Sequence, residues 1–417
     1  MRERTADRAG TREDALLAHP GVDAARACIR ETDEQTIADM VAAVQIPAPP
    51  FGEKERGAWM CERFRSIGLA DVVTDEIGNV LARLPGSGSP AGGNGSLPPA
   101  APIVVAAHLD TVFPPETPIR LRREQGRIHA PGISDNCRGL ATLLALGRAL
   151  LHAGIRPAAP VVFVANVGEE GVGDLRGTKH MLREGSPWRS MQAFISVDGT
   201  GVRRIVTRGV GSRRLRVTVD GPGGHSWADW GAPNPINALG LGIAELARLT
   251  PPRQPRTVLT VGRMAGGTSV NAIPDSTWLE IDLRSEAGAP LLELEAQVRR
   301  LFAQGTAEAN ARRRRGTPAL NLTIELIGDR PTGETAPGSV LVRAARAATR
   351  AIDELPELVS SSTDANAPMA LGIPAIAMGA GGEAGGTHTV EEWYSNEKGP
   401  EGIERVLLTI LGVTGVV

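Results

Sequence analysis

The chain has 417 residues, 22% of them charged, and a formal net charge of −2, so it is long enough for two or three domains and lacks the basic character of a nucleic-acid-binding protein. Its three cysteines are scattered without the spacing of a disulfide framework or a cysteine zinc site. The N-terminus is charged, and no apolar run reaches the roughly 18 residues of a membrane span. We therefore expect a cytoplasmic protein with neither nucleic acid nor membrane as partner.

The N-terminal part of the chain predicts one clear helix. Residues 1–30 are polar, and we expect poor order at their start. Thr32 and Gln35 form a helix-capping pattern, apolar residues follow at helical spacing, and Pro47 ends the predicted helix. Further on, residues 84–102 are rich in Gly, Ser and Pro and predict a surface loop.

From there, apolar strands and helices alternate. Strands are predicted at 102–108, 160–166 and 193–199, with a helix at 137–154. This alternation is typical of an α/β domain whose mainly parallel sheet has helices on both faces. A further helix near 337–353 and a strand at 373–379 continue the same pattern.

Residues 209–327 have a different pattern, in which strands alternate apolar and polar residues and therefore have one solvent-exposed face. The sequence predicts an inserted α+β domain here, which divides the first domain into residues 1–208 and 328–417. Its strands are predicted at 213–221, 256–264, 277–285 and 320–328, and its helices near 234–249 and 291–311. The four arginines at 312–315 are interpreted as a solvated helix end rather than an RNA-binding patch.

Several charged side chains occur where a predicted strand becomes a loop. His108 and Asp110 share one side of an extended segment, and a carboxylate beside an imidazole can orient it for metal binding. The other acids at such positions are Asp135, Glu169, Glu170 and Asp198. A single acid of this kind is most often a turn or cap residue. The carboxyl ends of parallel strands, however, lie at one edge of the sheet. This many carboxylates at one edge would repel one another unless a cation is bound there. His388 follows a glycine-rich loop and adds a second imidazole, a ligand set that suits zinc, or manganese or cobalt.

These residues, in this order and with an inserted α+β domain before His388, resemble the M20 family of dinuclear metallopeptidases and amidohydrolases, including its peptidase T-like and carboxypeptidase G2-like members. The resemblance extends from about residue 30 to the end. It implies two divalent metal ions, most simply Zn²⁺, with Co²⁺ or Mn²⁺ as alternatives. Asp135 would bridge the two ions, His108 and Asp198 would complete one site, and Glu170 and His388 would complete the other.

The resemblance also implies roles for residues that do not bind metal. Asp110 would orient His108, and Glu169 would be the general base that takes a proton from the water between the metals. His225, in the stretch DGPGGHSW of the inserted domain, would contact the substrate of the partner subunit in a homodimer formed through that domain. Asn271 and Arg284 would bind polar groups of the substrate, although Arg284 could equally be a salt-bridged strand residue.

The expected reaction is hydrolysis of an amide or peptide bond in a small substrate. Asp198, where many family members have Glu, and the stretch STDAN at 362–366 favour a di- or tripeptide over an N-acyl amino acid, which remains the alternative together with a carboxypeptidase G2-like activity. A metal-binding scaffold without hydrolytic activity is a further alternative, but the presence of Glu169 argues against it. The glycine-rich stretches lack the context of a nucleotide-binding loop.

Overall fold

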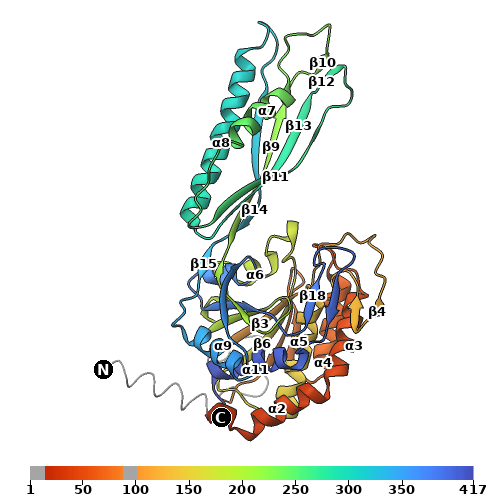
Figure 1. Cartoon of the computed structure of the whole chain (residues 1–417), viewed down its shortest axis with the longest axis vertical. Helices are drawn as coiled ribbons and strands as arrows, with labels where there is room; N and C mark the ends of the chain where they lie inside the picture. Colours follow the sequence, from red (N-terminus) through yellow and green to blue (C-terminus); the bar gives the residue numbers. More distant parts are fainter. Residues whose placement is uncertain (1–14, 88–100, 417) are drawn as a thin grey trace, which may run out of the picture. The chain divides into compact units, whose positions relative to one another are not determined.

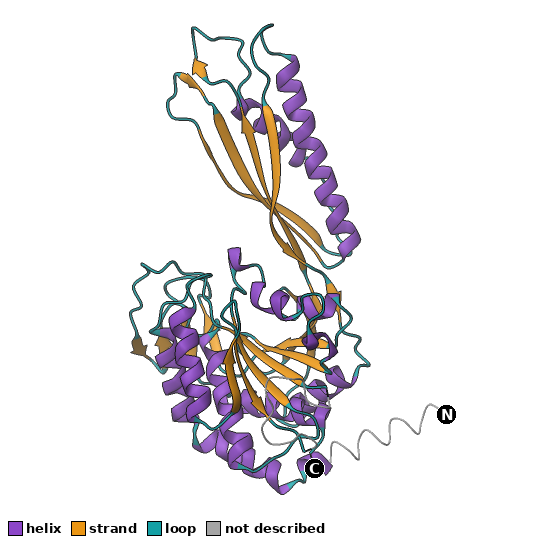
Figure 2. Cartoon of the chain, turned by 180° about the vertical axis from the view of Figure 1, so that it is seen from behind, coloured by secondary structure: helices purple, strands orange, loops and turns teal. Residues whose placement is uncertain are grey.

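The computed structural model describes residues 15–87 and 101–416, which divide into two compact units (Figures 1 and 2). The large unit contains the described chain up to Gly209 and from Gly333 onward, and the inserted unit contains Val210–Thr332. The expected disorder of residues 1–14 and the predicted loop over 88–100 lie outside the described residues. Among the helices that are described, none has the length and apolar content needed to cross a membrane.

The large unit is built on a sheet of nine strands. These strands are β1 (Ala70–Thr74), β2 (Val80–Leu84), β3 (Ile103–His108), β6 (Val161–Asn166), β7 (Ala193–Val197), β8 (Arg204–Gly209), β15 (Gly333–Glu334), β16 (Glu357–Ser361) and β17 (Ala375–Met378). The order is β1-β2-β6-β3-β7-β17-β8-β15, and β16 pairs with β8. The central pairs β6–β3, β3–β7 and β7–β17 are parallel, so the carboxyl ends of these strands lie at one edge of the sheet.

Helices cover both faces of this sheet (Figure 2). They are α2 (Pro20–Glu31), α3 (Asp33–Val44), α4 (Lys54–Ser66), α5 (Cys137–His152), α6 (Arg176–Met181), α9 (Val340–Arg350), α10 (Asn366–Ala370) and α11 (Gly399–Thr414), with short 3-10 turns η1 (Gly171–Gly173) and η2 (Pro187–Ser190). The mixed sheet with helices on both sides confirms the predicted α/β fold class.

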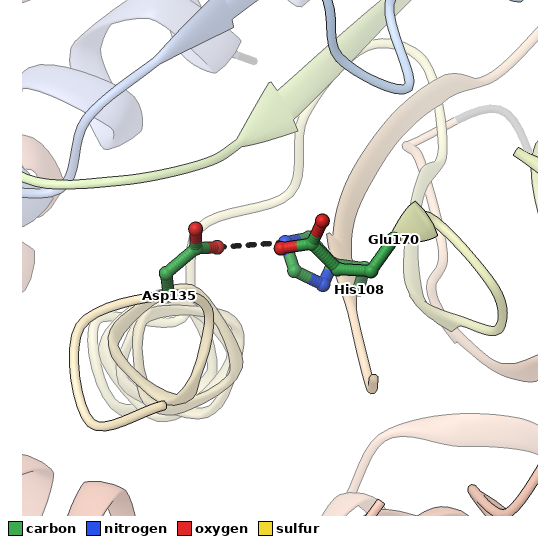
Figure 3. Close-up of side chains that lie close together, drawn as sticks. All are labelled: His108, Asp135 and Glu170. Atoms are coloured by element: carbon green, nitrogen blue, oxygen red, sulfur yellow. Dashed lines mark hydrogen bonds and ion pairs between the residues drawn. The ribbon is translucent and has the colours of Figure 1, made fainter. Parts of the chain in front are cut away.

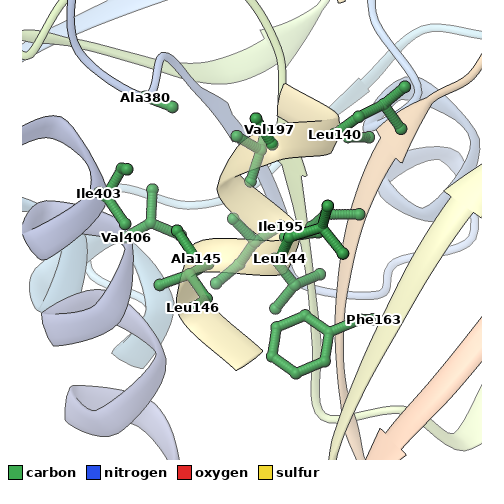
Figure 4. Close-up of a cluster of buried hydrophobic side chains, with 14 of the residues drawn as sticks. Leu140, Leu144, Ala145, Leu146, Phe163, Ile195, Val197, Ala380, Ile403 and Val406 are labelled. Atoms are coloured by element: carbon green, nitrogen blue, oxygen red, sulfur yellow. The ribbon is translucent and has the colours of Figure 1, made fainter. Parts of the chain in front are cut away.

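The central strands are buried on both faces because alternate side chains enter two different cores. In β3, Ile103, Val105 and Ala107 belong to one hydrophobic cluster, whereas Val104 and Ala106 belong to the other. Figure 4 shows the first cluster, in which side chains of α5 pack against the sheet and α11. A continuous apolar run is therefore the sequence pattern of such a strand.

Two features of the N-terminal part were not predicted. Residues 20–31, at the end of the polar N-terminal segment, form α2, because Val22, Ala25 and Ile29 recur at helical spacing and are fully buried. Thr32 precedes α3 as predicted, but its hydroxyl donates to the carbonyl oxygen of Cys28 at 2.8 Å rather than capping α3. The three cysteines are free and buried.

A small four-stranded sheet lies within the same unit. It contains β4 (Arg122–Glu124), β5 (Arg127–His129), β18 (Glu383–Gly385) and β19 (Trp393–Ser395), in the order β18-β19-β5-β4. The pairing of β5 with β19 is antiparallel. It brings the segment that precedes α5 next to a segment more than 250 residues further along the chain.

The inserted unit is an antiparallel sheet covered on one face by two helices (Figure 1). Its main sheet has the order β11-β13-β9-β14, and β10 pairs with β12. The elements are β9 (Gly211–Asp220), β10 (Gly224–His225), α7 (Pro235–Leu246), β11 (Thr257–Gly266), β12 (Ala272–Ile273), β13 (Ser276–Ser285), α8 (Gly288–Ala311) and β14 (Asn321–Arg330). Strict alternation of buried and half-buried residues along β13 shows why this region has a strand period of two in its sequence.

Candidate metal centre

His108 is the last residue of β3, and its imidazole is held in one tautomer. The ring is 1% exposed, and Nδ1 lies 2.9 Å from the main-chain carbonyl oxygen of Asp110. Since a carbonyl can only accept a hydrogen bond, Nδ1 carries the proton and donates it. In the neutral ring, Nε2 then has its lone pair directed toward Asp135, whose Oδ1 is 3.1 Å away.

The position of the turn after β3 is set by a buried guanidinium. Arg56 is 1% exposed, and it donates to the carbonyl oxygens of Leu109 at 2.6 Å and Ile46 at 2.5 Å. Since Leu109 stands between His108 and Asp110, this contact orients the segment that carries both residues.

Asp110 serves mainly the loop after β6. Its carboxylate accepts hydrogen bonds from the main-chain N–H groups of Glu169 at 2.9 Å and Glu170 at 2.7 Å. The same carboxylate is 3.6 Å from Nδ1 of His108, so the close contact with the imidazole comes from the Asp110 carbonyl instead. Asp110 thus holds both glutamates by their main chain. Burial opposes the charge of Asp110, but its contact with His108 and these two N–H donors lower its pKa.

Asp135 stands in the turn that leads into α5. Gly132 begins this turn with φ +82°, where an added Cβ would lie 2.6 Å from the side chain of Thr111, so only glycine fits without rearrangement. The next residue, Asn136, caps α5 by accepting from Gly139 N–H at 3.1 Å and donates to the Val197 carbonyl at 2.9 Å. The turn is therefore tied to both the helix and the end of β7.

Glu170 and His388 complete the convergence on Asp135. His388 follows β18 and is about half exposed. Its Nε2 lies 3.1 Å from Asp135 Oδ2 and 3.0 Å from Glu170 Oε1. His108, Asp135 and Glu170 also each offer one ligand atom within 4.8 Å of the other two (Figure 3). Two imidazoles and two carboxylates from four separate segments thus meet at one place.

The charges of this cluster are strongly coupled. Hydrogen bonds to Asp135 and Glu170 raise the pKa of His388 to about 10. Burial opposes protonation of His108, yet its contacts with Asp110 and Asp135 raise its pKa well above the usual value. Burial and the negative charge of Asp135 raise the pKa of Asp198, at the end of β7, to about 7. Asp198 therefore belongs to the same electrostatic cluster, although it is outside the group of three defined by the 4.8 Å spacing.

The donor set fits a divalent cation. With its proton on Nδ1, the neutral His108 ring directs the Nε2 lone pair at Asp135 Oδ1, 3.1 Å away, and the two atoms repel each other unless a proton or a cation lies between them. Imidazole nitrogen together with carboxylate oxygen is a ligand combination of zinc, and manganese or cobalt accept it too.

The other residues predicted for the site lie in the inserted unit, where His225 and Asn271 are neighbours. His225 pairs with Ala272 across β10 and β12, and the Asn271 carbonyl accepts from Ser226 N–H at 3.0 Å. His225 is exposed, and its Nδ1 accepts from the N–H groups of Trp227 at 3.2 Å and Ala228 at 3.3 Å. Its proton is therefore on Nε2, which is available to donate outward.

Arg284 is at the opposite end of the inserted sheet. It is eight residues along β13 from Ser276, which is on the side of His225, and this corresponds to about 26 Å. Its Nε donates to Asp282 Oδ2 at 2.6 Å. Arg284 thus forms an ion pair within its own strand, while its side chain is 41% exposed.

Two buried carboxylates near the centre were not predicted. Glu392 accepts four hydrogen bonds from the turn that carries Asp135. Asp364, inside the STDAN stretch, accepts from Asn166 Nδ2 at 2.7 Å and Thr178 Oγ1 at 2.6 Å. Their partners lie more than 180 residues away in the chain, so a local pattern had no signal for these contacts.

Comparison with known proteins identifies the class to which this fold and site belong. Residues 104–411 match the model of peptidase family M20/M25/M40, and the chain belongs to this family. It is therefore a hydrolase of peptide or amide bonds, in a family of metal-dependent enzymes, with a His/Asp/Glu cluster able to bind metal. A search of curated protein sequences gave no match.

Solved structures share the fold at low sequence identity. The aminopeptidase PepT from Bacillus cereus is 23% identical with a TM-score of 0.70, covering 91% of this chain and 98% of its own. A tripeptidase from Staphylococcus aureus is 20% identical with a TM-score of 0.72 and the same two coverages. The dipeptidase Dug1p from Saccharomyces cerevisiae is 14% identical with a TM-score of 0.71, covering 94% of this chain and 98% of its own.

Proposed function

We propose that this protein hydrolyses the peptide bond of a di- or tripeptide, using two divalent cations, most simply Zn²⁺, with Co²⁺ or Mn²⁺ as alternatives. The observation that carries the proposal is the convergence of the His108 and His388 Nε2 atoms on the two oxygens of Asp135. A carboxylate approached by one imidazole on each oxygen is suited to bridging two cations. Glu169, which precedes Glu170 in the chain, would transfer the proton of the attacking water.

Five residues would hold the metals. His108 and Asp198 would bind one cation, Glu170 and His388 the other, and Asp135 would bind both. Bound cations would lower the pKa of the attacking water from about 15.7 toward 7 and polarise the substrate carbonyl. The raised pKa of Asp198, about 7, supports its place here, because a nearby positive charge would stabilise the carboxylate form.

Glu169 would be the general base. It is 5% exposed and precedes Glu170, whose backbone is extended with φ −80° and ψ 146°. Adjacent side chains of extended backbone point in opposite directions, so Glu169 is directed differently from its metal-binding neighbour. It would take a proton from the attacking water and deliver it to the leaving nitrogen. Asp110 would hold both glutamates through their N–H groups and, through its carbonyl, orient His108.

The proposed enzyme is a homodimer through the inserted unit. Nε2–H of His225 would donate to the oxygen on which negative charge develops in the partner's site, and Asn271 would bind the substrate beside it. Arg284 would bind a substrate carboxylate. A dipeptide is about 7 Å long, whereas roughly 26 Å separates Arg284 from the His225 end of the sheet. Both groups contact one substrate only if they come from different subunits.

The small-peptide substrate is favoured over other amides by two features. The structures with TM-scores of 0.70 to 0.72 include an aminopeptidase, a tripeptidase and a dipeptidase, and Asp198 stands where small-peptide members of the family have Asp. A hydantoinase/carbamoylase family amidase from Burkholderia vietnamiensis also shares the fold, with a TM-score of 0.68. N-carbamoyl and N-acyl amino acids are therefore the substrates to compare with peptides.

The test is metal analysis of the purified protein, followed by assays with Zn²⁺, Co²⁺ or Mn²⁺ on unmodified di- and tripeptides and on N-acyl and N-carbamoyl amino acids. We expect two cations per chain and release of a free N-terminal residue from peptides. Faster cleavage of the acylated substrates would replace the peptidase assignment with a deacylase. Absence of metal binding in the wild-type chain would refute the proposed centre.

A further inference from the structure

Glu392 is a fully buried carboxylate whose hydrogen-bond donors all come from the turn that carries Asp135. Its side chain is 0% exposed. Oε1 accepts from Ser134 N–H at 2.8 Å, from the Ser134 hydroxyl at 2.6 Å and from Asp135 N–H at 3.1 Å. Oε2 accepts from Gly132 N–H at 2.9 Å. Three main-chain N–H groups and one hydroxyl therefore surround a single anionic group.

The main chain of Glu392 also forms hydrogen bonds with the segments that contain Ala130 and Thr389. Its carbonyl accepts from Ala130 N–H at 3.1 Å, and its N–H donates to Thr389 carbonyl oxygen at 3.1 Å. Directly after it, β19 pairs with β5, with Trp393 opposite His129. Glu392 is thus joined on one side to the Asp135 turn and on the other to the residue that follows His388.

This double attachment links two ligands that are far apart in the sequence. Asp135 and His388 approach within 3.1 Å, but their segments share no regular strand pairing at those positions. Burial raises the pKa of Glu392 while the hydroxyl and N–H donors lower it. Burying a carboxylate is costly without full hydrogen bonding, and here every donor is used to define the shape of the metal-bearing turn.

We propose that Glu392 is a positioning residue of the metal centre, which holds the Asp135 turn against the His388 segment so that both ligands are aligned before a cation binds. This inference rests on the proposed function, because it assumes that Asp135 and His388 are ligands. Removal of a group that hydrogen-bonds to a metal ligand commonly weakens metal binding by about 10- to 100-fold.

The test is Glu392→Gln, with Glu391→Gln as the matched control. The amide has the size of the carboxylate, but its NH₂ group must face an N–H donor of the turn, either that of Gly132 or those of Ser134 and Asp135. Glu391 is the neighbouring acid, 69% exposed, and pairs only at the surface with Arg122. Zn²⁺ affinity is measured by competition with a chromophoric chelator, and folding by circular dichroism.

We expect Glu392→Gln to bind Zn²⁺ about 10- to 100-fold more weakly and Glu391→Gln to bind it as the wild type does. Equal affinity in a folded Glu392→Gln protein would overturn the inference while leaving the metal centre intact. If that variant does not fold, Ser134→Ala decides, because it removes one donor to Glu392 and should weaken binding about two- to tenfold; unchanged affinity would overturn the inference. Wild-type protein that binds no Zn²⁺, Mn²⁺ or Co²⁺ would overturn both proposals.

Discussion

The large unit and the inserted unit present their polar residues in opposite ways. His108 in the large unit is 1% exposed and has both ring nitrogens engaged within its own unit. His225 in the inserted unit is exposed and has only Nδ1 engaged there. A buried polar cluster must be satisfied within its own fold, whereas an exposed imidazole with an unused proton is suited to a group that arrives from outside. This difference supports the proposal above, in which the large unit would hold the ions and His225 would act in the site of a partner subunit.

The largest loss of activity is expected when the proposed proton carrier of the large unit is removed. Glu169→Gln should lower kcat by about 10²- to 10⁴-fold while both cations remain bound, because the substitution leaves the five proposed ligands in place. Turnover and metal content of the same preparation provide the measurement. Glu184→Gln, at an exposed position, is the control. A Glu169→Gln protein with near-wild-type turnover would show that the base has been misassigned.

The corresponding test of the inserted unit is His225→Ala. Loss of a donor to a developing oxyanion should lower kcat by about 10²- to 10³-fold without changing the metal content, since His225 is not among the proposed ligands. His152→Ala, at the exposed end of α5, should behave as the wild type.

Mixing provides a sharper form of the same test. In a dimer of one Glu169→Gln chain and one His225→Ala chain, one site combines the intact Glu169 with the intact His225 of the other subunit. Activity should therefore reappear when the two inactive proteins are mixed and allowed to exchange subunits. Continued inactivity after demonstrated exchange would contradict a site shared between subunits.

The separate cores of the two units allow a prediction on stability. Phe302 in α8 is fully buried in the cluster that belongs to the inserted unit, so Phe302→Ala should cost about 3–5 kcal/mol of unfolding free energy there. Zn²⁺ affinity should stay the same, because the proposed ligands are in the large unit. Denaturant unfolding followed by circular dichroism, with Zn²⁺ titration of the folded protein, tests this. A large loss of Zn²⁺ affinity would show that the two units depend on each other.

The smallest expected effect is at the arginine-rich end of α8. Arg312 follows the helix and pairs with Glu308 on an exposed surface, and such pairs contribute little. Arg312→Ala should change the unfolding free energy by less than about 0.5 kcal/mol. Binding of an RNA oligonucleotide, measured at low salt before and after the substitution, should be negligible in both proteins. Strong RNA binding that becomes weaker in Arg312→Ala would show that the arginines at 312–315 form an RNA-binding patch after all.

Much of the fold could be predicted because burial on a regular element leaves a periodic pattern. The apolar run of β3 and the alternation along β13 both identified strands and distinguished the two kinds of sheet. The pattern failed where the polar composition of the first residues concealed the short apolar stripe of α2. It also failed at Thr32, whose hydroxyl donates to the Cys28 carbonyl oxygen of the preceding helix and accepts no capping hydrogen bond from α3.

Local patterns were enough to find the candidate ligands, because acids at predicted strand ends and a histidine after a glycine-rich loop can be recognised without distant information. The class of protein came from the resemblance of these residues, in their order along the chain, to the M20 family. Only the tertiary structure decided which groups support them: that the carbonyl of Asp110 contacts His108, that its carboxylate holds Glu169 and Glu170, and that Glu392 holds the Asp135 turn. These contacts join segments 59 to 260 residues apart or depend on main-chain direction. Hydrogen bonds of that kind follow from how the elements pack in three dimensions, and no local pattern of residues encodes them.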